Sequence, residues 1–233
     1  MGILKSVGKK IGKSVIKVGA SFAAIETINK LEKKVRENKK KKIDLFLEDR
    51  KENHKKYILI QDKTKVNETY KILNQNGIIK YLVKGNFFSI KHDLSLYDYT
   101  GNKKIGGVKE QLISIRLPIS FEKNPKDYNL FLGNKFVGKI KSRYSVSKHK
   151  YICSFNKNWR IVGNMSGSCY KLYENEVVLM ELKKQIAIHE DIYFIDVLDV
   201  DNELICILIA LAIDCSLSSK FEDNDNAIIR KII

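Results

Sequence analysis

The chain has 233 residues, a formal net charge of +16 and a hydrophobic fraction of 44%, which suits one globular domain with a basic extension. Of the 43 basic residues, 37 are Lys and 6 are Arg, a bias that disfavours specific nucleic-acid binding because base readout relies on Arg. The four cysteines form no CxxC pair, so we expect free thiols in a reducing, cytoplasmic compartment. They are Cys153, Cys169, Cys206 and Cys215.

The excess positive charge is concentrated in the N-terminal 56 residues, which hold 17 Lys or Arg against 7 Asp or Glu. Over residues 1 to about 37, apolar residues recur every three or four positions, which predicts an amphipathic helix. A charged connector follows, up to residue 56. The predicted apolar stripe is Val7, Ile11, Val15, Val18, Phe22 and Ile25, and the opposite face carries Lys5, Lys9, Lys10, Lys13 and Lys17.

A Lys-rich face opposite an apolar stripe is typical of helices that lie in the interface of an anionic membrane. We therefore predict that these five lysines contact lipid headgroups and that the six apolar residues insert into the membrane. The protein would then be peripheral on the inner face of the membrane. Packing of the stripe on the rest of the chain, or self-association and partner binding through it, stays open as the alternative.

From Tyr57 to about Asp201 the pattern changes to alternation of apolar and polar residues, broken by turn signals, which predicts short antiparallel strands. So many strands must close or stack to hide their edges. The clearest predicted strands are Ile78–Val83, Phe87–Ile90, Leu94–Tyr97, Phe136–Val146, Val177–Leu182 and Tyr193–Leu198. The turn signals are Asn76-Gly77, Gly101-Asn102, Gly133-Asn134, Asn175-Glu176 and Asp201-Asn202.

Ten consecutive apolar residues, Leu204 to Ile213, follow the strands and end before Asp214. A helix that spans a membrane needs roughly 20 such residues, so this segment is too short to span. A helix that is apolar on every side must then be buried inside protein. We predict a core helix over about residues 203–214, enclosed by the strands, and a polar tail over residues 217–233.

The order of several apolar motifs resembles the LURP-one-related group, which belongs with the tubby C-terminal and phospholipid-scramblase proteins. The motifs are Tyr81-x-Val83-x-Gly85-x-x-Phe88-Ser89, Leu94-x-Leu96-x-Asp98-x-x-Gly101, Trp159-x-Ile161-x-Gly163, Tyr170-x-Leu172 with Val177, and Asp191-x-Tyr193 before the apolar helix. The resemblance covers residues 57–216. It implies a mainly β fold: a closed antiparallel barrel of about twelve strands around a central hydrophobic C-terminal helix.

The resemblance also implies a lipid site. Tubby-type proteins bind phosphoinositide headgroups through Lys-x-Arg on a barrel strand, and Lys139-x-Lys141-x-Arg143 has this spacing. The alternation of a strand puts these three residues on one face and Ile140 on the other. A solvated outer face of the strand is the alternative interpretation. The Pro-rich region, cysteine cluster and acidic calcium-binding loop of scramblases are not apparent in the sequence, so we expect no lipid scrambling.

Catalytic signals are weak. His54, His92, His149 and His189 are scattered without the spacing of a zinc site, and no nucleophile elbow is present. His189-Glu190-Asp191 is compact, and we expect it in an exposed turn. The sequence therefore predicts a non-enzymatic tubby-like module without metal or cofactor that associates with anionic membrane lipid. The alternative is a structural or interaction module whose N-terminal helix mediates oligomerisation or partner binding.

Overall fold

A computed structural model describes residues 33–49, 53–62, 69–85, 92–111, 127–144, 149–154, 158–163, 168–186 and 190–229. The chain divides into two compact units, Met1–Asp49 and Arg50–Ile233. In the first unit, residues 33–48 form a helix, so the predicted charged connector is helical through its lysine run. All eleven residues predicted to contact or enter the membrane from the N-terminal arm lie outside the described residues.

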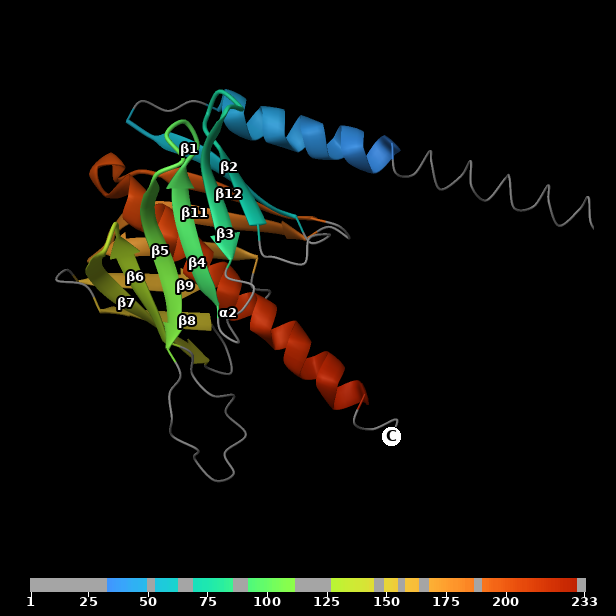
Figure 1. Cartoon of the computed structure of the whole chain (residues 1–233). Coiled ribbons are helices and arrows are strands. Elements are labelled where there is room, and N and C mark those ends of the chain that lie inside the picture. The colour runs from blue at the N-terminus through green and yellow to red at the C-terminus, as the bar shows by residue number, and fades with distance from the viewer. Residues whose placement is uncertain are drawn as a thin grey trace, which may run out of the picture. The chain divides into compact units, whose positions relative to one another are not determined.

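The second unit is built from twelve antiparallel strands and a C-terminal helix (Figure 1). Each strand pairs with the next along the chain, and β1 pairs with both β2 and β12, so the strand order is that of a closed barrel. The predicted mainly β, antiparallel architecture with a C-terminal helix is confirmed. The strands are β1 (Lys55–Asp62), β2 (Thr69–Leu73), β3 (Ile79–Gly85), β4 (Asp93–Asp98), β5 (Lys104–Gln111), β6 (Asp127–Leu132), β7 (Lys135–Tyr144), β8 (His149–Ser154), β9 (Trp159–Gly163), β10 (Cys169–Glu174), β11 (Val177–Ile186) and β12 (Glu190–Val197).

Four of the five predicted turns join neighbouring strands. Each of these four turns contains a residue in the left-handed region of backbone space, where Gly and Asn are the least strained residues. These residues are Gly77, Asn102, Gly133 and Asn175. The fifth turn signal, Asp201-Asn202, instead lies in a short 3-10 helix, η1 (Val200–Asn202), which leads from β12 into the C-terminal helix. The predicted strand Phe87–Ile90 lies outside the described residues.

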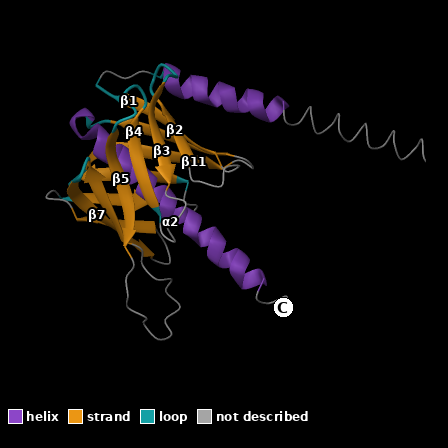
Figure 2. Cartoon of the chain, viewed as in Figure 1, coloured by secondary structure: helices purple, strands orange, loops and turns teal. Residues whose placement is uncertain are grey.

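The C-terminal helix α2 (Glu203–Ile229) runs through the ring of strands and continues beyond it (Figures 1 and 2). Every residue from Cys206 to Ile213 is buried, as predicted for a core helix. On β5, a side chain on Gly106 would place its Cβ atom 2.8 Å from the carbonyl oxygen of Phe131 and 3.5 Å from Leu208 Cδ1. Glycine therefore lets this strand approach both its neighbour and the helix.

The predicted end of this helix near residue 214 is wrong, because α2 extends to Ile229. The stretch predicted as a polar tail contains neither Gly nor Pro, so nothing in it stops a helix once the core segment has nucleated one. Asp214 is fully buried and does not mark the surface. Within the described part of the chain, no helix is both long enough and apolar enough to cross a membrane.

The strand order gives the barrel two different ends. The short hairpins β2–β3, β4–β5, β6–β7 and β10–β11 lie at one end, together with the start of β1 and the start of α2. We call this the hairpin end. The later part of α2 leaves the barrel at the opposite end, which we call the exit end (Figure 1).

Candidate functional site

Four lysines gather on the outer surface of β5 and β7, on either side of β6. Lys109 lies opposite Asn129, which lies opposite Lys139, and in the next row Gln111, Asp127 and Lys141 are aligned in the same way. We call Lys104, Lys109, Lys139 and Lys141 the basic face. Ile140 is fully buried, so its neighbours on both sides point outward, as the alternation of a strand requires.

A β-bulge in β7 sets which residues join this face. Leu130 lies opposite Gly138 whereas Phe131 lies opposite Phe136, which leaves Val137 as the extra residue. Without the bulge, Phe136 would point inward with Gly138 and Ile140. With it, Phe136 is 52% exposed and packs edge-on against Phe131, with 5.9 Å between the ring centres.

The lysines of the basic face are only partly neutralised. Lys139 Nζ lies 3.6 Å from Asp127 Oδ2, and Lys109 Nζ lies 3.9 Å from Asp93 Oδ2. Among the residues that the structure describes, none forms an ion pair with Lys104 or Lys141. Within this part of the chain, no acidic group neutralises these two lysines of the face.

A small pocket of about 150 Å³ opens beside the basic face. Binding sites for drug-sized molecules are typically about 300–1,000 Å³, so this pocket suits a small charged group and not a large substrate. Its lining brings together β5 and the β6–β7 hairpin. The lining residues are Lys104, Gly107, Lys109, Phe131, Gly133 and Asn134.

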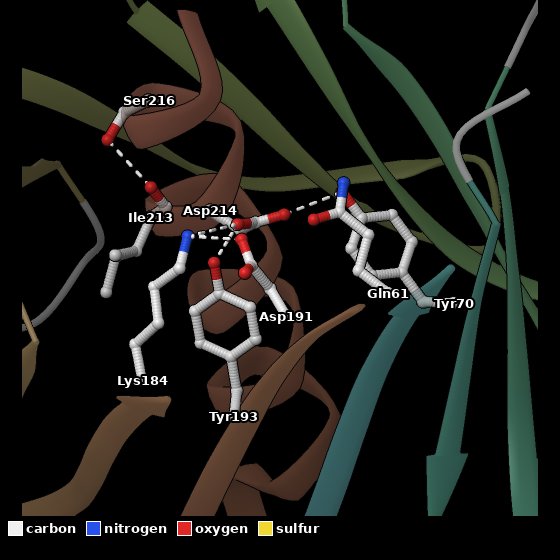
Figure 3. Close-up of polar contacts among 8 residues, drawn as sticks. All are labelled: Gln61, Tyr70, Lys184, Asp191, Tyr193, Ile213, Asp214 and Ser216. Carbon is white, nitrogen blue, oxygen red and sulfur yellow. Dashed lines mark hydrogen bonds and ion pairs between the residues drawn. The ribbon is translucent and has the colours of Figure 1, made fainter. Parts of the chain in front are cut away.

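A buried polar cluster surrounds Asp214 of α2 (Figure 3). It lies toward the exit end of the barrel, where β1 and β11 end and β2 and β12 begin. Asp214 of α2 accepts hydrogen bonds from the hydroxyl of Tyr70, at 2.7 Å, and from the hydroxyl of Tyr193. Lys184 Nζ lies 3.5 Å from Asp214 Oδ1 and 2.9 Å from Asp191 Oδ2. Gln61 donates to the Tyr70 hydroxyl at 3.2 Å. We call these residues the exit-end cluster, and they tie α2 to β1, β2, β11 and β12.

This cluster corrects the expectation for His189-Glu190-Asp191. Asp191 is not in an exposed turn: its side chain is 7% exposed, and it is the second residue of β12. His189 lies outside the described residues. Because the charged atoms of Lys184, Asp191 and Asp214 are closed off from solvent, the cluster is suited to fixing the helix and not to binding a ligand.

A second carboxylate fixes the other end of α2. Glu203, the first residue of the helix, accepts hydrogen bonds from Lys55 at 2.8 Å, Lys80 at 2.7 Å and the hydroxyl of Tyr81 at 2.7 Å. Burial opposes ionisation of this carboxyl, but the hydrogen bonds from Lys55, Lys80, Tyr81 and Tyr57 outweigh it and lower the pKa of Glu203 to about 2. The positive N-terminal end of the helix dipole favours the same charge.

This low pKa predicts an acid-sensitive contribution to stability. Since the pKa of Glu203 is lower in the folded chain than in the unfolded chain, its stabilisation is complete above about pH 4.5 and is lost as the pH falls toward 2. Glu203→Gln should lower the free energy of unfolding by on the order of 2–3 kcal/mol at neutral pH. The two proteins should converge in stability near pH 2. Thermal unfolding of both across this range measures the difference, and a gap independent of pH would contradict the assignment.

A wider pocket of about 510 Å³ lies at the hairpin end and is a second candidate site in the barrel unit. Beside it, His54 Nδ1 lies 3.3 Å from Asp196 Oδ1, a pairing that general bases also use. The described lining residues supply no Ser, Thr or Cys that such a base could activate. They are Asn53, His54, Lys55, Gln75, Leu198, Asp199, Val200 and Asp201. Across the described ranges, no group of three or more His, Cys, Asp or Glu side chains could hold a metal ion.

Of the predicted headgroup residues, the structure places Lys139 and Lys141 together on the outer face of β7. Arg143 lies on the same strand, paired with Lys150, but its side chain lies outside the described part of the chain. Sequence reasoning missed Lys109, which the β5–β6–β7 register brings beside them, and Lys104, which lines the same pocket as Lys109. No local signal in the sequence specifies that register across the long β5–β6 connection.

Comparisons with known proteins give the family of this chain and two proteins that it resembles. The chain is 27% identical over 161 residues to the uncharacterized protein YxjI of Bacillus subtilis (strain 168). The matched region covers 69% of this chain and 91% of that protein. An X-ray structure of an Arabidopsis thaliana protein matches 67% of this chain and 91% of that chain at 14% identity, with a TM-score of 0.41. The family model described as LURP-one-related matches residues 55–214, from the first strand to the buried Asp214. The chain therefore belongs to the LURP-one-related family.

Proposed function

We propose that this protein is a non-enzymatic module that binds anionic lipid at a membrane surface through the basic face of its barrel. Membership of the LURP-one-related family supports, at a general level, a lipid- or protein-binding module. Two observations carry the finer proposal: Lys109 is aligned across β6 with Lys139, next to the row of Lys141, and Lys104 and Lys109 line a pocket of phosphate-group scale. In this proposal the N-terminal arm lies in the membrane interface and adds to the affinity.

Simple electrostatics gives the expected strength. A lysine held near an anionic membrane surface contributes on the order of 1 kcal/mol. The ion pairs to Asp93 and Asp127 weaken two of the four lysines, so the face alone should bind weakly. Since the contacts are exposed, high salt should release the protein. A basic arm that binds the same bilayer would raise the affinity through effective concentration.

Vesicle sedimentation of the full-length protein tests this proposal. Replacement of Lys104, Lys109 and Lys141 by Gln should lower partitioning onto phosphatidylcholine vesicles that contain phosphatidylserine or a phosphoinositide by on the order of 100-fold. A matched control replaces three exposed lysines of other strands, Lys71, Lys84 and Lys183, by Gln, which removes the same charge. The control should keep most of the binding.

The arm is tested in the same assay. Lys9, Lys13 and Lys17→Glu should weaken binding whether or not the basic face is intact, and combining both sets of changes should abolish it. If the basic-face variant and its control lost the same amount of vesicle binding, the net charge of the protein would explain the binding, and the proposal of a defined site would be contradicted. Wild-type protein that ignores anionic vesicles at low salt would overturn lipid binding and favour a protein partner.

A further inference from the structure

The exposed large hydrophobic side chains of the barrel unit gather at one end. Within the described part of this unit there are four: Ile78, 61% exposed, Tyr99, 49%, Phe136, 52%, and Val177, 66%. Each lies at the tip of a different hairpin, and the strand order places all four hairpins at the hairpin end. Single exposed apolar residues are common on proteins, but their concentration at one end makes this end a candidate contact surface.

Charge divides this end into two sectors. Tyr99 and Phe136 lie on the neighbouring β4–β5 and β6–β7 hairpins, where Lys103, Lys104 and Lys135 are all exposed. We call these five residues the hairpin edge. Around Val177 the exposed charges are mainly acidic instead: Glu176 lies on the same turn, where Arg160 of β9 pairs with it at 3.0 Å, and Asp201 follows β12. Only the first sector combines aromatic rings with an excess of positive charge.

The hairpin edge is built on fixed backbone. The amide of Gly133 donates to the carbonyl of Ile105 at 2.8 Å, which joins the two hairpins next to their tips. In the β4–β5 turn, Asp98 accepts hydrogen bonds from the Thr100 hydroxyl at 2.7 Å and the Gly101 amide at 3.0 Å. Phe136 is braced by Phe131. A partner that binds here would not need to order a loop, which lowers the entropic penalty of binding.

We propose that the hairpin edge docks the barrel onto an anionic bilayer, with the rings of Tyr99 and Phe136 at the boundary between headgroups and acyl chains. This inference rests on the proposed lipid-binding function and adds the orientation of the barrel. Aromatic side chains favour that boundary, and lysines beside them meet the lipid phosphates. Lys104 belongs to both the hairpin edge and the basic face, so the two surfaces are continuous.

The chain connectivity agrees with this orientation. β1 begins at the hairpin end, so the segment that follows the basic N-terminal arm enters the barrel on the side that would face the bilayer. The later part of α2 leaves at the opposite end, which would face away. In this orientation the acidic sector around Val177 would tilt away from the anionic surface.

Tryptophan placed in the full-length protein tests the contact. The native Trp159 is buried, so its emission gives a constant background. On anionic vesicles, Tyr99→Trp and Phe136→Trp should each add a blue-shifted component that brominated lipids quench. The matched control, Val177→Trp on the acidic sector, should show neither effect. Phe136→Ser should keep the charge and the melting temperature of the protein. It should lower vesicle partitioning by about tenfold, because the variant lacks the half-exposed ring whose transfer from water into the bilayer favours binding.

The outcomes separate this inference from the proposed function. Protein that sediments with anionic vesicles while the tryptophans introduced at 99 and 136 stay unshifted and unquenched would overturn the docking edge and leave lipid binding intact. A shift in Val177→Trp alone would overturn it as well, in favour of the other sector. Wild-type protein that does not sediment with these vesicles at low salt would overturn both.

Discussion

Leu208→Asp should abolish cooperative folding. Leu208 is fully buried in the middle of α2, and its Cδ atoms lie 3.5 and 3.6 Å from where a Cβ atom on Gly106 would be. A carboxylate placed there meets the apolar core and the backbone of β5. The burial penalty of an unpartnered ionisable group is several kcal/mol, against a total stability of roughly 5–15 kcal/mol for a typical domain.

Circular dichroism melting and size-exclusion chromatography measure this outcome. Leu208→Met is the matched control, because it conserves volume and apolar character and should reduce the free energy of unfolding by less than about 1.5 kcal/mol. A soluble Leu208→Asp protein with a cooperative melt close to that of the wild type would mean that α2 is not enclosed by the strands. Lowering the pH would not fully restore the stability of Leu208→Asp, because a neutral carboxyl group at this position still lacks a hydrogen-bond partner.

The same helix carries a natural carboxylate six residues later, at Asp214, and this contrast shows what the core tolerates. Both positions are fully buried. Asp214 differs because Tyr70, Tyr193 and Lys184 are placed around it. The core therefore tolerates a buried carboxylate where side chains of three strands donate hydrogen bonds or an ion pair to it. It does not tolerate one where the only neighbours are apolar side chains and backbone groups that are already hydrogen-bonded.

Much of the fold could be predicted because local physics specifies it. Alternation of apolar and polar residues marked strands, and Gly or Asn at left-handed positions marked four hairpins, at Gly77, Asn102, Gly133 and Asn175. Ten apolar residues in a row, too short for a membrane, identified the enclosed segment of α2. Each of these signals depends on a few adjacent residues, so the sequence carries it directly.

What could not be predicted depends on contacts between distant residues. The bulge at Val137, which turns Phe136 outward, follows from how β7 must fit against β6. The basic face needs the register of β5, β6 and β7, and the role of Asp191 needs Lys184 from the neighbouring strand β11. The end of α2 was misplaced for a related reason: the predicted helix ended with the apolar segment at Asp214, whose buried partners lie up to 144 positions away in the chain.

Lys184→Met nearly conserves the volume of the side chain, yet it should be among the most destabilising single substitutions in the barrel. Lys184 Nζ bridges two carboxylates, Asp191 at 2.9 Å and Asp214 at 3.5 Å, and all three side chains are at most 7% exposed. Removing one partner of a buried ion pair typically reduces stability by about 3–5 kcal/mol, because the remaining charges stay desolvated. Here the change removes the cation that two buried carboxylates share.

A double-mutant cycle tests this interpretation. Asp214→Asn should be milder, since it leaves the pair of Lys184 with Asp191 and keeps a carbonyl acceptor for Tyr70 or Tyr193. The double change should be less destabilising than the sum of the two single changes, because it leaves one fewer unpaired charge. Denaturant unfolding of the wild type and the three variants measures each free-energy change. Strict additivity would mean that the exit-end cluster does not act as one charged unit that holds α2 in the barrel.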